Sequence, residues 1–304
     1  MGRLAVGIVL PFGQVGPERT THRWTDVRDM ALRAESLGFD AVWVPDELLW
    51  LREGKKPQGF WDGVSMAAGA AAVTSRIKVG TWVLSALHRN AGILAKTVET
   101  LDEISGGRFV FGLGAGHAWP GQAHAFGLPE DRTFARFEEA LEVIVPLLRG
   151  GRADFQGTFH TANDLAQIPQ GPRPNQIPIM LGVLGPRGQR LAAKYADIWS
   201  CYAEKRSDMV EFGPRIAGLE AACAEVGRDP KTIGRSAGID VKPLEKLADP
   251  TAATISGSPD QIADQIRAVR DGGFTQVELL LTPSTIESLE AFTPVLELLG
   301  ADER

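Results

Sequence analysis

The chain has 304 residues, of which 44% are hydrophobic and 23% are charged, and its formal net charge at pH 7 is −6. These values are ordinary for a globular chain with a sizeable core, and the acidic balance argues against a nucleic-acid partner, which requires a basic face. Two cysteines cannot build a disulfide framework, and no apolar run approaches the roughly 20 residues of a membrane span. The apolar start of the chain ends at Pro11 and predicts a buried strand rather than a signal segment. We therefore expect a cytoplasmic protein without a membrane or nucleic-acid partner.

Short apolar runs alternate with longer stretches of helical period along the chain. The runs predict buried strands over residues 4–10, 41–44, 77–83, 109–113, 177–181, 196–200, 236–241 and 277–281. Helical periodicity begins near Thr25 and ends with a closing helix over 286–299. Continuous apolar strands separated by helices indicate a parallel sheet covered on both faces, and eight such units suit a closed barrel. We predict a (β/α)8 TIM barrel.

Residues 150–176 break the alternation. The run Phe155–His160 is followed by a proline-rich tail, and together they predict an inserted hairpin or lid. Because no internal repeat or second pattern is present, we expect a single domain over residues 1–304 with an insertion at 150–176.

In a (β/α)8 barrel the loops that follow the strands build the active site, so polar residues there are the candidates. Asp46 and Glu47 follow the second strand and offer carboxylates for acid, base or hydrogen-bond chemistry, although helix capping or a backbone hydrogen bond would also explain them. His117 follows the fourth strand and can exchange a proton near neutral pH, although an ordinary loop histidine fits equally well. We predict that Glu47 and His117 are catalytic.

Glycines follow the fourth and fifth strands. Gly112, Gly114 and Gly116, with Ala115 between the last two, allow backbone to approach a ligand and expose amides to an oxygen or anion. The segment 182–185, with Gly182, Val183 and Gly185, precedes a helix start and is a natural anion site, with a simple turn as the alternative.

Charged and aromatic side chains also lie near strand ends. Lys205 and Arg206 follow the sixth strand and are candidates for binding an anionic tail, although a solvated pair of charges is the simpler interpretation. Trp50, Trp82 and Trp119 could flank a flat ring, or they could serve packing alone. The histidines are scattered without metal-ligand spacing, so we do not expect a metal site.

The long stretch 74–116, in the order and spacing of its residues, and the segments 37–46 and 192–197 resemble the bacterial luciferase-like superfamily of flavin- and deazaflavin-dependent oxidoreductases. The resemblance extends from residue 4 to about residue 282. It implies a barrel enzyme that holds FMN or the deazaflavin coenzyme F420 in the barrel mouth. The residues expected to contact the cofactor are Asp46, Thr81, Trp82, Val83, Gly114, Ala115, Gly116, Gly182, Val183, Gly185, Cys201 and Lys205.

The resemblance also separates subgroups. Members that use coenzyme F420 carry a non-prolyl cis peptide in a bulge of the third strand, which corresponds to Trp82–Val83. Lys205 matches a lysine that holds the coenzyme's anionic tail, which favours coenzyme F420 over FMN. Sugar-phosphate dehydrogenases of this group have Asp-His where this chain has Asp46-Glu47, and glutamate where it has His117, so sugar-phosphate oxidation is not expected.

Three functions remain open at this point. The leading hypothesis is hydride transfer between coenzyme F420 and a small organic substrate. The alternatives are an FMN-dependent monooxygenase, which uses reduced flavin and oxygen with a partner reductase, and a non-catalytic flavin-binding barrel. Family members commonly pair through their second and third helices, and Met66, Ala67, Ala70 and Ala71 offer a small-residue surface there. We therefore expect a homodimer.

Overall fold

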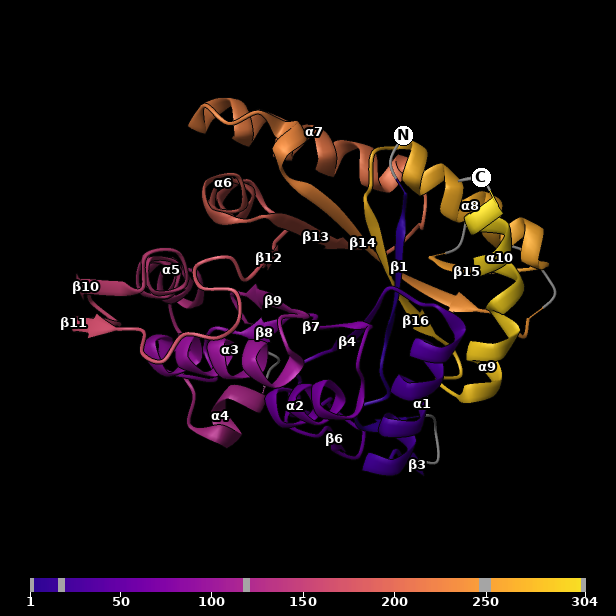
Figure 1. The fold of residues 1–304 in the computed structure, drawn as a ribbon, viewed down its shortest axis with the longest axis horizontal. Helices are drawn as coiled ribbons and strands as arrows, with labels where there is room; N and C mark the ends of the chain where they lie inside the picture. Colours follow the sequence, from indigo (N-terminus) through magenta and orange to yellow (C-terminus); the bar gives the residue numbers. More distant parts are fainter. Residues whose placement is uncertain (1–2, 16–19, 117–120, 246–252, 302–304) are drawn as a thin grey trace. The chain divides into compact units, whose positions relative to one another are not determined.

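The computed structural model describes residues 3–15, 20–116, 121–245 and 253–301 (Figure 1). Within them, parallel strands alternate with helices in chain order, which confirms the predicted (β/α)8 class. The eight main strands are β1 (Ala5–Val9), β4 (Ala41–Val44), β7 (Lys78–Thr81), β9 (Phe109–Gly114), β12 (Ile179–Gly182), β13 (Ile198–Tyr202), β14 (Gly234–Lys242) and β16 (Gln276–Leu281). No helix in the described ranges is long and apolar enough to cross a membrane. Residue contacts divide the chain into two compact units.

The first unit comprises Met1–Pro11, Asp26–Trp43 and Val183–Arg304. Its parallel sheet has the order β13-β14-β16-β1-β4, and a short strand, β15 (Thr254–Ser256), pairs with β14. Its helices are α1 (Trp24–Leu37, which begins two residues before the unit), α6 (Pro186–Tyr195), α7 (Met209–Val226), the 3-10 turn η1 (Pro230–Thr232), α8 (Pro259–Asp271), α9 (Ile286–Ala291) and α10 (Thr293–Ala301).

Local sequence signals explain where these helices begin and end. α8 starts at a capping box, in which the Ser258 hydroxyl accepts from the Gln261 amide and the Gln261 side chain accepts from the Ser258 amide. α8 and α10 lie side by side (Figure 1). The single closing helix expected over 286–299 is wrong, because it is divided at Phe292 into α9 and α10, and Pro294, which has no backbone N–H to donate, lies in the first turn of α10. The ring of Phe292 is fully buried and stacks on Phe39.

One carboxyl group lies inside the sheet of the first unit. Glu278 on β16 is fully buried, and its Oε1 accepts hydrogen bonds from Ser236 and Gln276. Burial raises the pKa of Glu278 to about 7, although these hydrogen bonds work in the opposite direction.

The second unit comprises Phe12–Thr25 and Val44–Gly182. In its parallel sheet β9 pairs with β7 and, on another side, with β12, while the short strand β8 (Leu84–Ser85) pairs with β9 beyond β7. Its helices are α2 (Gly63–Val73), α3 (Ala91–Ser105), α4 (Gln122–Phe126) and α5 (Thr133–Gly150). Its antiparallel hairpins are β2–β3 (Gln14–Val15, Thr20–Thr21), β5–β6 (Leu49–Trp50, Gln58–Gly59) and β10–β11 (Arg152–Gln156, Thr161–Ala166).

The hairpin β10–β11 lies within residues 150–176, the segment that interrupts the alternation of strands and helices, and it packs beside α5 (Figure 1). The Glu139 carboxylate on α5 accepts hydrogen bonds from the three consecutive amides of residues 158–160 at the hairpin tip. The guanidinium groups of Arg132 and Arg136 lie over the ring of Phe159, at 4.3–4.5 Å from its centroid. These contacts hold the tip against α5, so the segment is a docked hairpin in this structure.

The small-residue face of α2 packs within its own chain. Ala67, Ala70 and Ala71 are at most 1% exposed, and α2 packs against α3 and β7. The expectation that these alanines form a surface for a partner is therefore wrong, because the methyl groups are needed for close packing inside the unit. The homodimer itself stays a prediction.

Candidate active site

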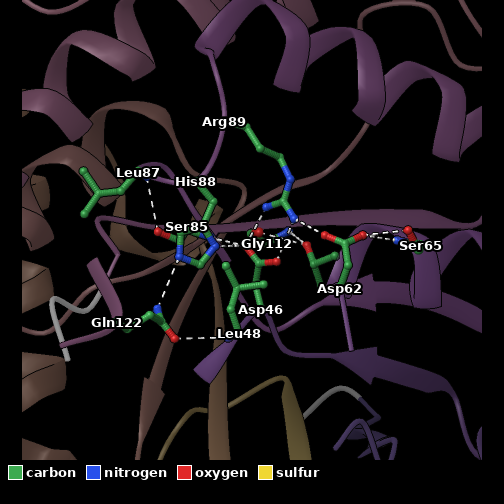
Figure 2. Close-up of polar contacts among 11 residues, drawn as sticks. Asp46, Leu48, Asp62, Ser65, Ser85, Leu87, His88, Arg89, Gly112 and Gln122 are labelled. Atoms are coloured by element: carbon green, nitrogen blue, oxygen red, sulfur yellow. Dashed lines mark hydrogen bonds and ion pairs between the residues drawn. The ribbon is translucent and has the colours of Figure 1, made fainter. Parts of the chain in front are cut away.

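The Asp46 carboxylate lies at the centre of a polar network at the carboxyl end of β4 (Figure 2). Its Oδ2 accepts from the Ser85 amide at 2.9 Å, from His88 Nδ1 at 3.0 Å and from Arg89 Nη1 at 2.6 Å. Its Oδ1 accepts from Arg89 Nη2 at 2.9 Å, which completes a bidentate pair. Burial by itself favours the protonated form, but the hydrogen bonds from His88 and Arg89 outweigh it and lower the pKa of Asp46. Asp46 is therefore an ionised anchor whose two oxygens already have four donors.

Arg89 connects this anchor to the start of α2. Its Nη2 also donates to Asp62 Oδ1 at 2.8 Å, and Asp62 caps α2 through the Ser65 amide at 2.7 Å. Figure 2 shows the guanidinium between the two carboxylates. The loop between β8 and α3 is thus fixed to Asp46 and to the start of α2. A hydrogen bond that Asp46 accepts from a cofactor, which it is expected to contact, would have to compete with this arrangement.

His88 extends the network towards α4. Its Nε2 lies 3.5 Å from the Gln122 amide nitrogen, and Gln122 Oε1 accepts from the amides of Leu48 and Leu49 at 3.2 and 2.8 Å. Because two backbone donors fix the orientation of the Gln122 amide, its nitrogen faces the ring. The ionised Asp46 can only accept, so the Nδ1 atom of His88 carries a proton directed at Asp46.

Glu47 follows Asp46 in the chain, but its pKa is shifted in the opposite direction. Its Oε2 is buried and has no hydrogen-bond partner among the described residues. Burial raises the pKa of Glu47, the charge of Asp46 raises it further, and the Glu47 amide and His88 oppose the shift only in part. Two adjacent carboxyl groups are thus separated into an ionised anchor and a group that retains its proton to higher pH, a pattern typical of acid–base sites.

The predicted cis peptide bond at Trp82–Val83 is present. It falls between β7 and β8, so the third strand ends at Thr81 and resumes at Leu84 rather than running over 77–83. Both side chains are half-buried. Thr81, in contrast, is fully buried, and its hydroxyl donates to the Gly112 carbonyl and accepts from the Gly112 amide. The Thr81 hydroxyl is therefore occupied within the sheet.

Gly112 and Gly114 of β9, and Gly116 two residues after it, each lie against the interrupted strand. A Cβ at Gly112 would lie 1.8 Å from the Thr81 oxygen, one at Gly114 would lie 2.9 Å from Val83, and one at Gly116 would lie 2.4 Å from Ser85. A Cβ at Gly182 on β12 would lie 3.0 Å from Val83. Contacts within the chain thus require these glycines, which the sequence alone had suggested would admit a ligand. Ala115 is half-buried between them.

The start of α6 has a glycine cap and a proline at its first turn. Gly185 is the N-cap residue, and because glycine has no side chain, no side chain of the N-cap residue caps the first turn of α6. Val183 is buried, its side chain packs over Gly188, and its carbonyl accepts from Trp199 Nε1 at 2.7 Å. Val183 therefore contributes packing, and the anion site at this helix start stays a prediction.

The residues after β13 are fixed by α7. Glu211 on α7 accepts hydrogen bonds from the amides of residues 204, 205 and 206, so a carboxylate of the chain fills this backbone concavity. The Lys205 side chain is exposed, and Arg206 pairs with Asp208. Cys201 is buried, and burial raises its pKa to about 12 although Arg215 opposes the shift. Cys201 is accordingly a protonated packing group, and the Lys205 ammonium remains available for an anionic ligand.

Sequence reasoning identified the two carboxylates but missed His88, Arg89 and Gln122. A signal for the first two existed, because they follow the interrupted third strand, where barrel sites gather. Gln122 lies on a five-residue helix that periodicity cannot reveal. His117 and Trp119 lie outside the described residues, so the role of His117 stays a prediction. Across the described part of the chain, His, Cys, Asp and Glu nowhere gather in a group of three that could hold a metal ion.

The chain belongs to the luciferase-like monooxygenase family, whose model it matches over residues 4–248. It is 30% identical over 229 residues to the F420-dependent glucose-6-phosphate dehydrogenase of Kineococcus radiotolerans, covering 72% of this chain and 65% of that protein. It is also 30% identical over 240 residues to the pyrimidine monooxygenase RutA of Escherichia coli K12, covering 74% of this chain and 61% of that protein. The chain thus spans less than two thirds of either relative. The chain is therefore a member of an oxidoreductase family that contains dehydrogenases and monooxygenases.

Solved structures resemble the chain over nearly its whole length. An F420-dependent secondary alcohol dehydrogenase in complex with an F420-acetone adduct has a TM-score of 0.79 at 19% identity and covers 97% of this chain and 98% of its own. The F420-dependent tetrahydromethanopterin reductase of Methanopyrus kandleri has a TM-score of 0.77 at 20% identity, covering 97% of both chains. A long-chain alkane monooxygenase has a TM-score of 0.78 at 15% identity, covering 99% and 92%. At these identities the likeness establishes the barrel fold alone.

Proposed function

We propose that the chain is a coenzyme F420-dependent oxidoreductase that transfers a hydride to or from a small organic substrate. The observation that carries this proposal is Glu47, whose buried Oε2 has no partner among the described residues and whose pKa is raised beside the ionised Asp46. Burying a carboxyl group without a hydrogen bond costs stability, so its retention at a strand end favours a role in chemistry. A bound deazaflavin supplies the hydride chemistry, and Glu47 exchanges the proton that must accompany it.

The residues present fit such a cofactor. Trp82 and Val83 provide a half-buried apolar surface at the end of the interrupted strand, and we assign the contact with the flat ring to them. The exposed Lys205 ammonium is assigned to the anionic tail. His117, by its place in the sequence after β9, is assigned a second proton-handling role. Because Glu47 stands where the resembling sugar-phosphate dehydrogenases have histidine, the proposal does not extend to oxidation of a sugar phosphate.

Equilibrium binding of the two cofactors tests this proposal. We expect the purified protein to bind coenzyme F420 at least about tenfold tighter than FMN, a difference of about 1.4 kcal/mol. Lys205→Ala should remove most of that preference, because it deletes the cation assigned to the tail. Lys231→Ala is the matched control, since Lys231 lies on η1 at the amino-terminal end of β14, away from the strand ends that carry barrel sites. Tighter binding of FMN would contradict the proposal.

The second candidate is an FMN-dependent monooxygenase that receives reduced flavin from a partner reductase. The similarity to pyrimidine monooxygenase RutA favours it. Oxygen uptake by the protein with reduced FMN and an organic substrate, at rates that coenzyme F420 does not support, would establish this candidate instead.

A further inference from the structure

The segment that carries Glu47 is anchored on both sides. Before Glu47, the Asp46 carboxylate has four donors, and after it the Leu48 carbonyl accepts from the Phe60 amide at 3.0 Å. Glu47 Oε2, in contrast, is buried and has no hydrogen-bond partner among the described residues. Because burying a polar group without a hydrogen bond costs free energy, this carboxyl group would turn to water on a mobile segment. It stays buried only while the surrounding structure holds the segment in place.

A side chain of α4 contacts this segment directly after the buried carboxyl group (Figure 2). Gln122 is 3% exposed, and its Oε1 accepts from the amides of Leu48 and Leu49 at 3.2 and 2.8 Å. One oxygen accepts from two consecutive amides only where the backbone curves around it, so this side chain fixes the turn of the chain at this point. Gly121, the N-cap residue of α4, also lies against the segment, since a Cβ there would meet the Leu51 side chain at 3.0 Å.

The same glutamine reaches the histidine that binds Asp46. Gln122 Nε2 lies 3.5 Å from His88 Nε2, and His88 Nδ1 lies 3.0 Å from Asp46 Oδ2. These contacts close a circuit that leaves the chain at Asp46 and returns to it at Leu48. Glu47 is the one residue that the circuit encloses. The glutamine amide adds no charge beside the two adjacent carboxyl groups, whereas a carboxylate in its place would add a third.

We propose that Gln122 is the positioning residue of the candidate active site and that it holds the Glu47 carboxyl group in its buried place. This inference rests on the proposed function, in which Glu47 exchanges a proton, and deepens it by naming the residue that places this acid. In this role Gln122 does not touch the reacting atoms but acts through the backbone. An amide that donates to Gln122 cannot turn to the Glu47 carboxyl group, where it would stabilise the ionised form.

The groups around Glu47 define the direction of the expected change. Burial raises the pKa of Glu47 most and the charge of Asp46 raises it further, while the Glu47 amide and His88 lower it. Arg89 and Asp62 lie beyond Asp46. Loss of the glutamine amide releases the segment, so water and the released amides reach the carboxyl group and stabilise its ionised form. The pKa of Glu47 should then fall towards its ordinary value, which a loss of packing elsewhere would not cause.

Infrared difference spectroscopy of the purified protein measures this pKa without cofactor or substrate. The carboxylic C=O band that disappears in Glu47→Gln belongs to Glu47, which separates it from the bands of other buried carboxyl groups such as Glu278. We expect Gln122→Met to move the titration midpoint of this band down by at least about one pH unit. Gln122→Asn keeps the amide but is too short to reach both backbone donors, so it should move the midpoint in the same direction. If Gln122→Met does not fold, Gln122→Asn decides.

A conservative variant and a matched control complete the experiment. Gln122→Glu should recover most of the shift, because a carboxylate oxygen accepts from the same two amides. Gln167→Met is the control, since Gln167 is also 3% exposed but donates to the Ala95 carbonyl of α3 at 2.8 Å. This control should leave the Glu47 midpoint in place. Affinity for coenzyme F420 should be unchanged in every variant, because Gln122 holds the acid and not the cofactor.

The outcomes separate the two proposals. A lowered midpoint in the Gln122 variants, together with tighter binding of FMN than of coenzyme F420, would reject the proposed function and retain the placement of Glu47 by Gln122. An unchanged midpoint in both Gln122→Met and Gln122→Asn, or an equal fall in Gln167→Met, would overturn the inference and leave the proposed function standing. If no carboxylic band disappears in Glu47→Gln, the inference is overturned as well, because there is then no protonated carboxyl group to hold.

Discussion

Replacing Arg89 by methionine removes the bidentate partner of the most buried carboxylate in the candidate site. The Asp46 side chain is 1% exposed and Arg89 is 16% exposed, so the pair is shielded from solvent. Breaking a buried ion pair by removing one partner costs about 3–5 kcal/mol. Because the Ser85 amide and His88 would still donate to Asp46, we expect the lower end of that range, about 3 kcal/mol. For a chain of this size that corresponds to a fall in Tm of roughly 6 °C.

Thermal and denaturant unfolding measure this loss, with Arg152→Met as the control. Arg152 forms a bidentate pair with Asp164 that has the same chemistry but is largely exposed, so its removal should change stability little. Equal losses of stability in the two variants would refute the view that burial makes the Arg89–Asp46 pair important.

The pH dependence provides a second check on the same pair. The folded pKa of Asp46 is lowered, so its contribution to stability is complete above the unfolded value of about 3.9 and is lost as the pH falls through the folded value. In the Arg89→Met variant Asp46 loses the hydrogen bonds and the charge of Arg89, which oppose the effect of burial on its pKa. The pKa of Asp46 should therefore be higher in the variant than in the wild type. The stability deficit of the variant should therefore shrink as the pH is lowered and Asp46 becomes protonated.

Four further predictions concern other sites. Glu47→Gln should lower turnover by at least about tenfold with little change in cofactor affinity, and it should remove the loss of activity that the wild type shows as rising pH ionises this acid. Gly114→Ala should destabilise the protein by about 1–3 kcal/mol, because its methyl group would meet Val83 at 2.9 Å, and adding Val83→Ala should restore stability. Glu139→Ala should speed amide hydrogen exchange at residues 158–160 without affecting turnover. Glu278→Gln should remove the decline in the free energy of unfolding expected between about pH 4.3 and pH 7, where the unfolded chain ionises this group and the folded chain does not.

Periodicity and local signals were sufficient for the fold class. Most of the main strands contain an apolar run and the longer helices have an apolar stripe, so the succession of a (β/α)8 barrel follows from residue order alone. The closing helix was misjudged because Pro294, a local signal that ends a helix before it, was overlooked. The same reasoning erred at Ala67, Ala70 and Ala71, where tertiary packing decides, because their small size serves packing within the chain.

Part of the candidate site could likewise be predicted from the sequence, and part of it is decided only by the tertiary structure. The place of Asp46 and Glu47 after a strand was enough to identify them, because barrel topology brings strand ends to one face. Their different protonation could not be inferred, since it depends on Arg89 and His88, which are distant in sequence and reach Asp46 only in the folded chain. Residue order determines which side chains reach the strand ends, whereas burial and hydrogen-bond partners, which exist only in the tertiary structure, decide which of them carries a proton.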